Sequence, residues 1–326
     1  MSILVTGGAG YIGSHTVKIL LEKGYEPVIF DNLSSGHRDL LPGGIFIQAD
    51  LREREKIEKV IREYRIEAVI HFAALIQVGE SYDNPRLYYT HNLITTLNLL
   101  EAMLEAGVKK FVFSSSAAVY GEPRFVPITE DHPLNPSNPY GQTKAFIEKI
   151  LADYGRAHGL SYVSLRYFNA AGADLDGRRG ELHEPETHLI PNIMLHLLNK
   201  KPYFELYGDD FPTPDGTAIR DYIHVLDLAE AHVLALRLME DKPVQAVYNL
   251  GTGQGYSVRE IISWVERITG KKVRLSLRPR RRGDVPILMA SKEKAVRELQ
   301  WEPRYSDIET IIRTAWKWHL YWSQQK

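Results

Sequence analysis

The most informative pattern in the chain is the segment ILVTGGAGYIGSHTVKILLEKGYEPVIFDN, residues 3–32. It begins with a short apolar run (3–6) and passes through a glycine-rich turn (7–15). A helix-like apolar pattern follows and ends at Gly24, before a second apolar run at 26–32. A strand, a glycine turn, a helix and another strand within about thirty residues make a βαβ unit. The first residues therefore predict parallel strands.

Three glycines in this turn have the spacing of a dinucleotide-binding loop. Gly7 permits the tight turn, Gly10 lets the backbone approach a pyrophosphate, and Gly13 lets the helix pack close to the strand. The helix N-terminus then faces the phosphates. Asp31 ends the second strand, where an acid binds ribose hydroxyls and repels a 2′-phosphate. We therefore predict NAD as the cofactor. Without Asp31 and the flanking strands and helix, the glycines would be equally compatible with an ordinary loop.

Three further apolar segments, 44–51, 67–75 and 108–121, have the composition of strands, and helical patterns lie between them. Strands that alternate with helices predict an α/β fold with a Rossmann-type, doubly wound parallel sheet. Ligands bind such sheets at the carboxyl ends of the strands. Asp50, at the end of the first segment, is expected beside an adenine.

The composition excludes several classes of protein. The 326 residues allow about two domains, and none of them is cysteine. Disulfides, thiolate zinc sites, iron–sulfur clusters and cysteine nucleophiles are therefore excluded. A net charge of −1 argues against a dedicated nucleic-acid binder. With no apolar run of about 18 residues and no signal peptide, we expect a cytoplasmic protein without a membrane partner.

The segment NPYGQTKAFIEKILADYGRAHG, residues 138–159, is predicted to be a helix. Tyr140 and Lys144 are four residues apart, so they share one helix face. A base near pH 7 needs the tyrosine pKa lowered by about 3 units. The lysine ammonium and a positively charged nicotinamide ring can supply that lowering. Ser116, at the end of a predicted strand, would orient the substrate oxygen. By itself the Tyr/Lys pair is also compatible with a solvated helix face.

Together these features resemble the extended short-chain dehydrogenase/reductase superfamily and, within it, the UDP-glucose 4-epimerase (UDP-galactose 4-epimerase) family. Related nucleotide-sugar dehydratases carry a Thr-Asp-Glu run where this chain has Ser116, Ala117 and Ala118. The epimerase reading is therefore favoured. The motifs that carry the resemblance are GGAGYIGSH (7–15), DNLSSG (31–36), HFAAL (71–75), SSSAAVYG (114–121), NPYGQTK (138–144), LRYFNAAGA (165–173), DGTAIRDYIHVLDLA (215–229) and RRGD (281–284).

The resemblance implies NAD-dependent inversion at C4 of a UDP-hexose through a transient 4-keto sugar. It implies Ser116, Tyr140 and Lys144 as the catalytic residues. The implied cofactor-binding residues are Gly7, Gly10, Tyr11, Ile12, Asp31, Asn32, Ser35, Gly36, Asp50, Leu51, Phe72, Ala73, Ala74, His91, Ser114, Tyr140, Lys144 and Phe168. The implied residues for the UDP-sugar are Ser116, Tyr140, Asn169, His188, Leu189, Tyr207, Arg220, Arg281, Asp284 and Leu288.

Three positions depart from the family pattern. Ile76 replaces a lysine close to the cofactor, and His91 replaces an asparagine on the nicotinamide side. Leu288 occupies the gatekeeper position of the sugar pocket, where tyrosine goes with plain hexoses and a small residue with N-acetylated sugars. A 4-epimerase of a UDP-N-acetylhexosamine, UDP-pentose or UDP-hexuronate is therefore the alternative. A non-catalytic dinucleotide sensor is disfavoured, because Tyr140 and Lys144 are both present.

The resemblance also implies two domains and a homodimer. An NAD-binding domain would cover 1–168, and a smaller α/β substrate domain would cover 169–326 and cross back to the first. Residues 247–253 have the pattern of a strand that returns to the sheet. The helical stretches 87–106 and 140–158 would pair with their copies in a four-helix bundle.

Two charged clusters have competing interpretations. The arginines in residues 278–282 could form a nucleic-acid patch or a solvated face, but the net charge of −1 and the place of Arg281 in the RRGD motif favour diphosphate binding. His183, Glu184, Glu186 and His188 could form a metal site. Their run lies in loop-like sequence and the implied chemistry needs no metal, so we predict none.

Overall fold

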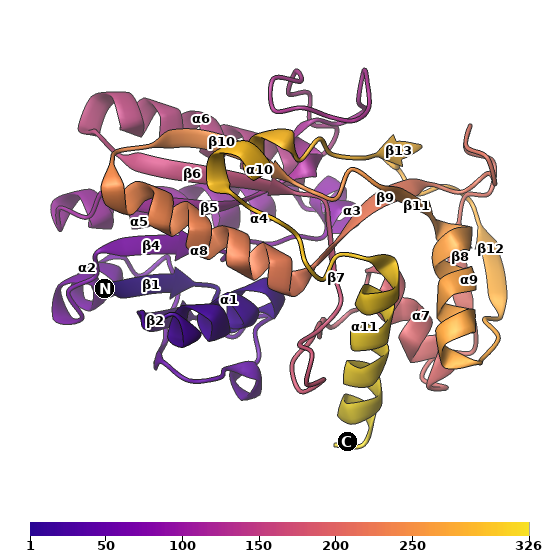
Figure 1. Ribbon diagram of the computed structural model, residues 1–326. Coiled ribbons are helices and arrows are strands. Elements are labelled where there is room, and N and C mark those ends of the chain that lie inside the picture. Colours follow the sequence, from indigo (N-terminus) through magenta and orange to yellow (C-terminus); the bar gives the residue numbers. More distant parts are fainter. Residues whose placement is uncertain (326) are drawn as a thin grey trace.

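A parallel sheet of seven strands lies at the centre of the computed structural model, which describes residues 1–325 (Figure 1). The strands follow one another in space in the order β10, β6, β5, β4, β1, β2, β3, and each neighbouring pair is parallel. Their bounds are β1 (Ser2–Thr6), β2 (Glu26–Asp31), β3 (Ile45–Gln48), β4 (Ala68–His71), β5 (Lys110–Ser116), β6 (Ser161–Tyr167) and β10 (Gln245–Leu250). The predicted doubly wound α/β sheet is confirmed.

The glycine turn between β1 and the first helix has the backbone that its residues predict. Gly7 has a φ of 71°, and a Cβ there would lie 2.5 Å from the amide nitrogen of Ala73. A Cβ on Gly13 would lie 2.3 Å from the carbonyl oxygen of Gly7. Both positions therefore require glycine, the first for the turn and its contact with the end of β4, the second for close packing of helix on strand.

Helices cover both faces of this sheet (Figure 1). Ile3 and Val5 of β1 point to one face, where α1 and α8 pack, while Leu4 between them points to the other. Each buried aliphatic side chain of this kind contributes about 1.5–3 kcal/mol. Helices α1 (Tyr11–Glu22), α8 (Val225–Asp241) and α10 (Glu293–Leu299) lie on the first face, and α2 (Arg54–Glu63), α5 (Thr95–Glu105) and α6 (Pro139–His158) on the second.

The predicted helix over 87–106 is interrupted. The chain forms α4 (Pro85–Tyr88), then the π-helical segment η2 (Tyr89–Ile94), and only then α5. The side-chain hydroxyls of Thr95 and Thr96 donate to the carbonyl oxygens of His91 and Asn92, and such back-bonding bends a helix. π-helical turns occur frequently at functional sites, and this one faces the cleft described below.

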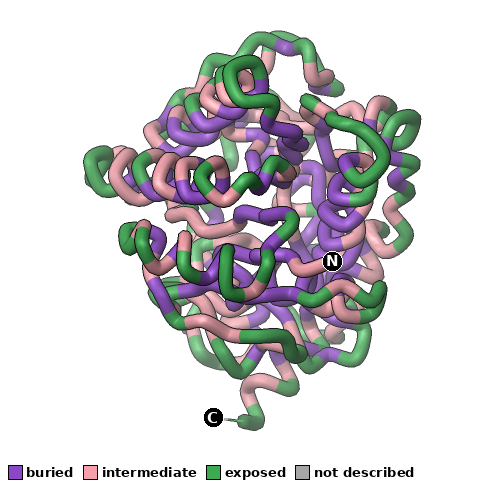
Figure 2. Tube along the Cα trace, turned by 90° about the vertical axis from the view of Figure 1, so that its left-hand side faces the viewer, coloured by how far each residue is buried: buried purple, intermediate pink, exposed green. Residues whose placement is uncertain are grey.

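The C-terminal half builds a second layer beside the first sheet and also contributes to that sheet. Figure 2 shows buried segments through the interior and exposed ones on the periphery. Helix α8 packs on α1, and β10 pairs with β6. The predicted return to the sheet is thus confirmed, but the strand begins two residues earlier than predicted and ends at Leu250, so residues 251–253 lie beyond it. The remaining elements are β7 (Asn169–Ala171), β9 (Ile219–His224), β11 (Gly255–Ser257) and β13 (Ile287–Leu288) in one sheet, β8 (Phe204–Tyr207) and β12 (Leu275–Arg278) in another, and helices α7 (Leu189–Leu197), α9 (Val258–Thr269) and α11 (Ile308–Ser323) around a third core.

Across residues 1–325, no helix has the combination of length and apolar character that crossing a membrane requires.

Candidate active site

A large cleft opens at the carboxyl ends of the parallel strands. Its volume is about 1100 Å³, and residues of both layers line it. That is large for a single small ligand and suits two bound together, since ligand pockets commonly measure about 300–1,000 Å³. Every site residue predicted from the sequence lines this cleft: Gly7, Gly10, Tyr11, Ile12, Asp31, Asn32, Ser35, Gly36, Asp50, Leu51, Phe72, Ala73, Ala74, His91, Ser114, Ser116, Tyr140, Lys144, Phe168, Asn169, His188, Leu189, Tyr207, Arg220, Arg281, Asp284 and Leu288.

The structure brings the three predicted catalytic residues to one wall of the cleft. Ser116 ends β5, and its hydroxyl oxygen accepts a 3.1 Å hydrogen bond from the Ala118 amide at the start of η3 (Ala117–Val119). Tyr140 lies in the first turn of α6. Asn138 caps that helix by accepting a 2.8 Å hydrogen bond from the Gly141 amide, so the position of Tyr140 is fixed by local sequence.

Lys144 lies one turn further along α6 and is fully enclosed. Its Nζ donates a 2.7 Å hydrogen bond to the carbonyl oxygen of Ser114 and lies 4.9 Å from the centre of the Phe113 ring. Burial lowers the pKa of Lys144 to about 7, although Glu148 opposes this shift. At neutral pH the lysine can therefore both hold and release a proton.

The expected lowering of the Tyr140 pKa is not found in the chain by itself. Burial raises the pKa of Tyr140 above its ordinary value, and a hydrogen bond with Ser116 only partly opposes the rise. The Lys144 Nζ lies 5.9 Å from the centre of the tyrosine ring, so its charge does not dominate. Phenolate formation therefore needs further positive charge in the cleft, which a nicotinamide ring would bring.

A buried ion pair that sequence reasoning missed holds α6 against the sheet. Arg166 donates from Nε to Glu148 Oε1 at 2.9 Å and from Nη1 to Tyr120 Oη at 2.8 Å. Ser115 donates to the same Glu148 oxygen at 2.5 Å. The spacing of Glu148 four residues after Lys144 places both on one helix face, but no local pattern identifies Arg166 of β6 as its partner.

The opposite wall forms a cradle that fits a dinucleotide. A Cβ on Gly10 would approach only the Gly7 carbonyl oxygen, at 3.3 Å, so this backbone is open towards the cleft at the N-terminus of α1. Asp31 accepts hydrogen bonds from the amides of Ala9 at 3.0 Å and Leu33 at 2.8 Å. The acid is thereby held at the end of β2, where a ribose would lie.

The third wall belongs to the C-terminal half and carries the predicted substrate residues. Arg281 pairs with Asp284 at 3.1 Å, and its guanidinium lies 5.2 Å from the centre of the Tyr207 ring. Leu288 of β13 lies opposite Arg220 of β9 in the sheet register. Leu288 also packs against the small core beside Ser116, so it lies close to the catalytic wall.

The arginines of residues 278–282 do not form one patch. Arg278 pairs with Glu205 and Arg280 with Asp210, and neither lines the cleft. Arg282 does line it, with its guanidinium 4.4 Å from the centre of the Tyr82 ring. Two cations are therefore neutralised by acids, which weakens the nucleic-acid interpretation.

Two further residues organise the cleft and carried no recognised motif. Tyr82, in α3 (Val78–Asp83), donates a 2.8 Å hydrogen bond to the carbonyl of Ser137. Asn92, in η2, donates from Nδ2 to the carbonyl of Leu75 at 3.1 Å and accepts from its amide at 2.9 Å. For Asn92 the available signal was a polar residue within the helical pattern of residues 87–106, whereas no sequence signal pointed to Tyr82.

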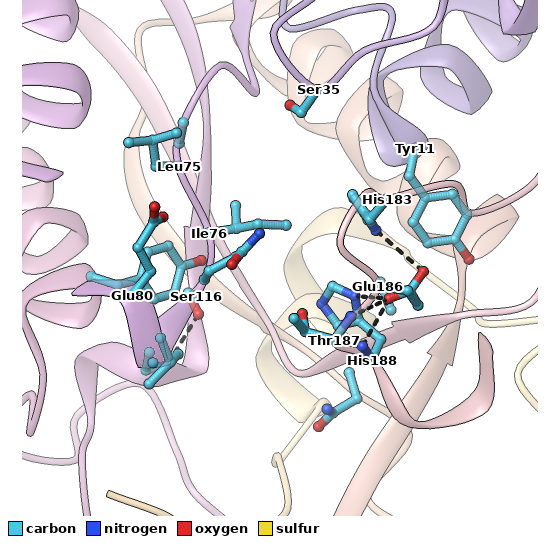
Figure 3. A pocket seen from close by; sticks show the side chains of 18 of the residues that line it. Tyr11, Ser35, Leu75, Ile76, Glu80, Ser116, His183, Glu186, Thr187 and His188 are labelled. Atoms are coloured by element: carbon cyan, nitrogen blue, oxygen red, sulfur yellow. Dashed lines mark hydrogen bonds and ion pairs between the residues drawn. The ribbon is translucent and has the colours of Figure 1, made fainter. Parts of the chain in front are cut away.

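A cluster of histidines and glutamates lies at the far end of the cleft, near Tyr11 (Figure 3). Donor atoms of Glu181, His183, Glu186 and His188 all lie within 4.8 Å of one another. The alternative that the sequence analysis set aside had Glu184 in place of Glu181, and Glu184 is exposed to solvent outside this cluster. Burial would lower the pKa of His188, but Glu181 and Glu186 outweigh it and raise this pKa to about 10.

Comparison with known proteins assigns the chain to a family. The model of the NAD dependent epimerase/dehydratase family matches residues 3–251. The chain is 50% identical over 319 residues to the UDP-glucose 4-epimerase of Halalkalibacterium halodurans, covering 98% of this chain and 96% of that one. It is 48% identical over 318 residues to that of Rhizobium meliloti, with 98% and 97% covered.

A solved structure agrees with these relatives. The UDP-glucose 4-epimerase from Brucella ovis, crystallised in complex with NAD, superposes with a TM-score of 0.93 at 50% identity and covers 97% of each chain. The sequence match and the structural match thus extend over nearly the whole chain. The chain belongs to the NAD dependent epimerase/dehydratase family.

Proposed function

We propose that the chain is a UDP-glucose 4-epimerase, which uses NAD to invert C4 of a UDP-hexose and so interconverts UDP-galactose and UDP-glucose. One observation carries the proposal. Ser116, Tyr140 and Lys144 meet on a cleft wall that faces both the glycine cradle and the arginines of the C-terminal half. A sugar held there would lie between a base and a hydride acceptor.

In this arrangement Tyr140 is the acid and base. Its phenolate oxygen takes the proton of the sugar 4-hydroxyl and later returns it to the 4-keto oxygen. Ser116 orients that oxygen by hydrogen bonding, and the charge of Lys144, fixed on the Ser114 carbonyl, favours the phenolate. Asp31 and the backbone from Gly7 to Gly10 would hold NAD, which supplies reversible hydride acceptance at C4 when bound.

Inversion requires the keto sugar to present its other face to the same acceptor. The nucleotide must therefore be held firmly while the sugar turns. Arg220 and Arg281 suit the diphosphate, because a guanidinium fork matches phosphate oxygens. The pair Arg281–Asp284 and the ring of Tyr207, which belong to the C-terminal half, support this role for Arg281.

Product analysis tests the proposal. The purified protein is incubated with UDP-galactose without added NAD, and UDP-glucose is expected to appear up to a fixed equilibrium ratio. Activity that appears only on addition of NAD would show weak retention of the cofactor, for which Ile76 is the candidate cause. If neither condition gives UDP-glucose, the sugar assignment is wrong.

A homodimer in the cytoplasm completes the proposal. Leu87, Ile94 and Phe146 are apolar yet 36%, 51% and 41% exposed, on α4, η2 and α6. A second copy that packs on these helices would bury them in a four-helix bundle. Light scattering should give twice the mass of one chain, and Ile94→Glu should shift it to the monomer.

A further inference from the structure

We propose that Glu181, His183, Glu186 and His188 form a structural binding site for a divalent transition-metal ion of the Zn²⁺ type, which fixes the loop before α7 in the wall of the cleft. The proposal departs from the sequence analysis, which predicted no metal at this run, and goes beyond the epimerase reaction, whose steps need no metal. His188 is the donor that the resemblance also implies beside the UDP-sugar. The proposal rests on donor geometry, on the charge of the cluster and on the hydrogen bonds that hold the donors.

The donor atoms are gathered as closely as a small coordination shell requires, and their separations of 2.8–3.8 Å lie on either side of the tetrahedral value. Zn²⁺ bonds of about 2.0–2.2 Å place tetrahedral donors roughly 3.3–3.6 Å apart. His188 Nδ1 lies 2.8 Å from Glu181 Oε1 and 3.1 Å from Glu186 Oε1, while His183 Nδ1 lies 3.2 Å and 3.8 Å from these two carboxylates. Two imidazoles and two carboxylates are also a donor set that Zn²⁺ accepts.

One donor has no hydrogen-bond partner in the described chain. His183 Nδ1 is buried, and the nearby Glu181 oxygen lies outside hydrogen-bonding geometry despite the 3.2 Å separation. A buried polar nitrogen without a partner costs free energy. Its lone pair is satisfied if it bonds a metal ion among the four donors (Figure 3).

The charge of the cluster also favours a bound metal ion. The side chains of Glu181 and Glu186 are each only 5% exposed. Among residues 1–325, the cationic groups within ion-pair distance of these two carboxylates are His183 and His188, with no lysine or arginine. Two buried carboxylates need compensating charge. In the chain alone a protonated His188 provides part of it, and one divalent ion would provide all of it with both imidazoles neutral.

Outer contacts hold the donors in place, as they do in metal sites. Glu186 Oε1 accepts 2.8 Å hydrogen bonds from the amides of Thr187 and His188. Asn192 Nδ2, one turn into α7, donates to the His188 carbonyl at 2.8 Å. Trp318 Nε1 of α11 donates to the Glu181 carbonyl at 2.9 Å. With four protein ligands the shell is closed, which is the arrangement of a structural ion.

Metal analysis of the full-length, untagged protein tests the site. The protein is dialysed against ZnCl₂ at low micromolar concentration, and bound zinc is measured by mass spectrometry. We expect about one Zn²⁺ per chain for the natural sequence, and Co²⁺ in its place should give the visible absorption of a tetrahedral ion. Substoichiometric zinc, at the level of a metal-free control protein, would overturn the proposal.

A matched pair of variants locates the ion. Glu186→Gln keeps the size of the side chain but removes a ligand charge, whereas Glu184→Gln makes the same change two residues away on an exposed side chain. Glu186→Gln should lose the zinc and Glu184→Gln should keep it. His183→Ala should also lose it, with circular dichroism confirming that the variant is folded. Equal zinc content in Glu186→Gln and Glu184→Gln would contradict the assignment.

Discussion

The Nζ atom of Lys144 donates a 2.7 Å hydrogen bond to the main-chain carbonyl oxygen of Ser114. The bond fixes the amino group at the carboxyl end of β5, two residues before Ser116. Burial lowers the pKa of this lysine to about 7, and Glu148 opposes that shift. Because this lysine is both fixed and desolvated, we expect its contribution to the stability of the protein to depend on pH.

Tyr140→Phe should abolish turnover while NAD stays bound. Removal of a general acid or base costs typically 10²–10⁴-fold in rate, and the phenol is the proton acceptor that the geometry provides. Initial rates with UDP-galactose and the NAD content of the purified variant check this. Tyr154→Phe, on the same helix but away from the cleft, is the control and should keep its rate. If Tyr140→Phe lost only a few-fold, the assigned base would be wrong.

Lys144→Met should raise stability most at low pH. The folded protein holds Lys144 with a pKa of about 7, against 10.5 ordinarily. The penalty for burying the charged form is therefore fully present below about pH 7 and fades as the pH rises towards 10.5. The lost hydrogen bond to Ser114 lowers stability equally at every pH. The stability of the variant relative to the natural protein should thus fall with rising pH.

Urea unfolding between about pH 6 and pH 10, without added nucleotide, measures that change. Lys149→Met is the control, because Lys149 is exposed on the same helix. Its stability relative to the natural protein should not follow this trend. A flat difference for Lys144→Met would show that the lysine is not desolvated.

Glu148→Gln should be strongly destabilising. The side chains of Glu148 and Arg166 are 6% and 5% exposed, so removing one charge leaves the other buried without compensation. Breaking such a pair costs about 3–5 kcal/mol. Denaturant unfolding checks the value. Asp153→Asn, an exposed acid on the same helix, should cost less than about 1 kcal/mol. If Glu148→Gln lowered the free energy of unfolding no more than Asp153→Asn does, the buried ion pair would contribute little to stability.

Leu288 should set the size of the accepted sugar. It packs beside the small core next to Ser116, so Leu288→Ser enlarges that side of the pocket. The ratio of kcat/KM for UDP-N-acetylglucosamine to that for UDP-galactose should rise, by about tenfold or more. Leu288→Tyr should lower the ratio. If both variants gave the natural ratio, Leu288 would not face the sugar.

Local sequence was sufficient for the elements that carry the cofactor and the base. The turn at Gly7 needs a positive φ, which glycine adopts freely. Gly13 is needed because the contact between helix and strand leaves no room for a Cβ. Helix α6 begins after Asn138 and ends before Gly159, as its capping residues predict. The spacing of Tyr140 and Lys144 on that helix then needs no tertiary information.

Other features depend on contacts between residues distant in sequence. The π-helical turn at Tyr89–Ile94 accompanies hydrogen bonds of Asn92 with Leu75, which no periodic pattern records. The pKa of Tyr140 rises because the surrounding chain excludes water, and burial is a property of the whole fold.

The histidine–glutamate cluster shows the same division. Their positions in the chain are enough to put His183, Glu186 and His188 in one short loop. That Glu181 joins them while Glu184 faces solvent depends on contacts with distant parts of the chain. The reason is physical: an irregular loop has no fixed period, so packing against α7 and α11 determines which of its side chains point inward.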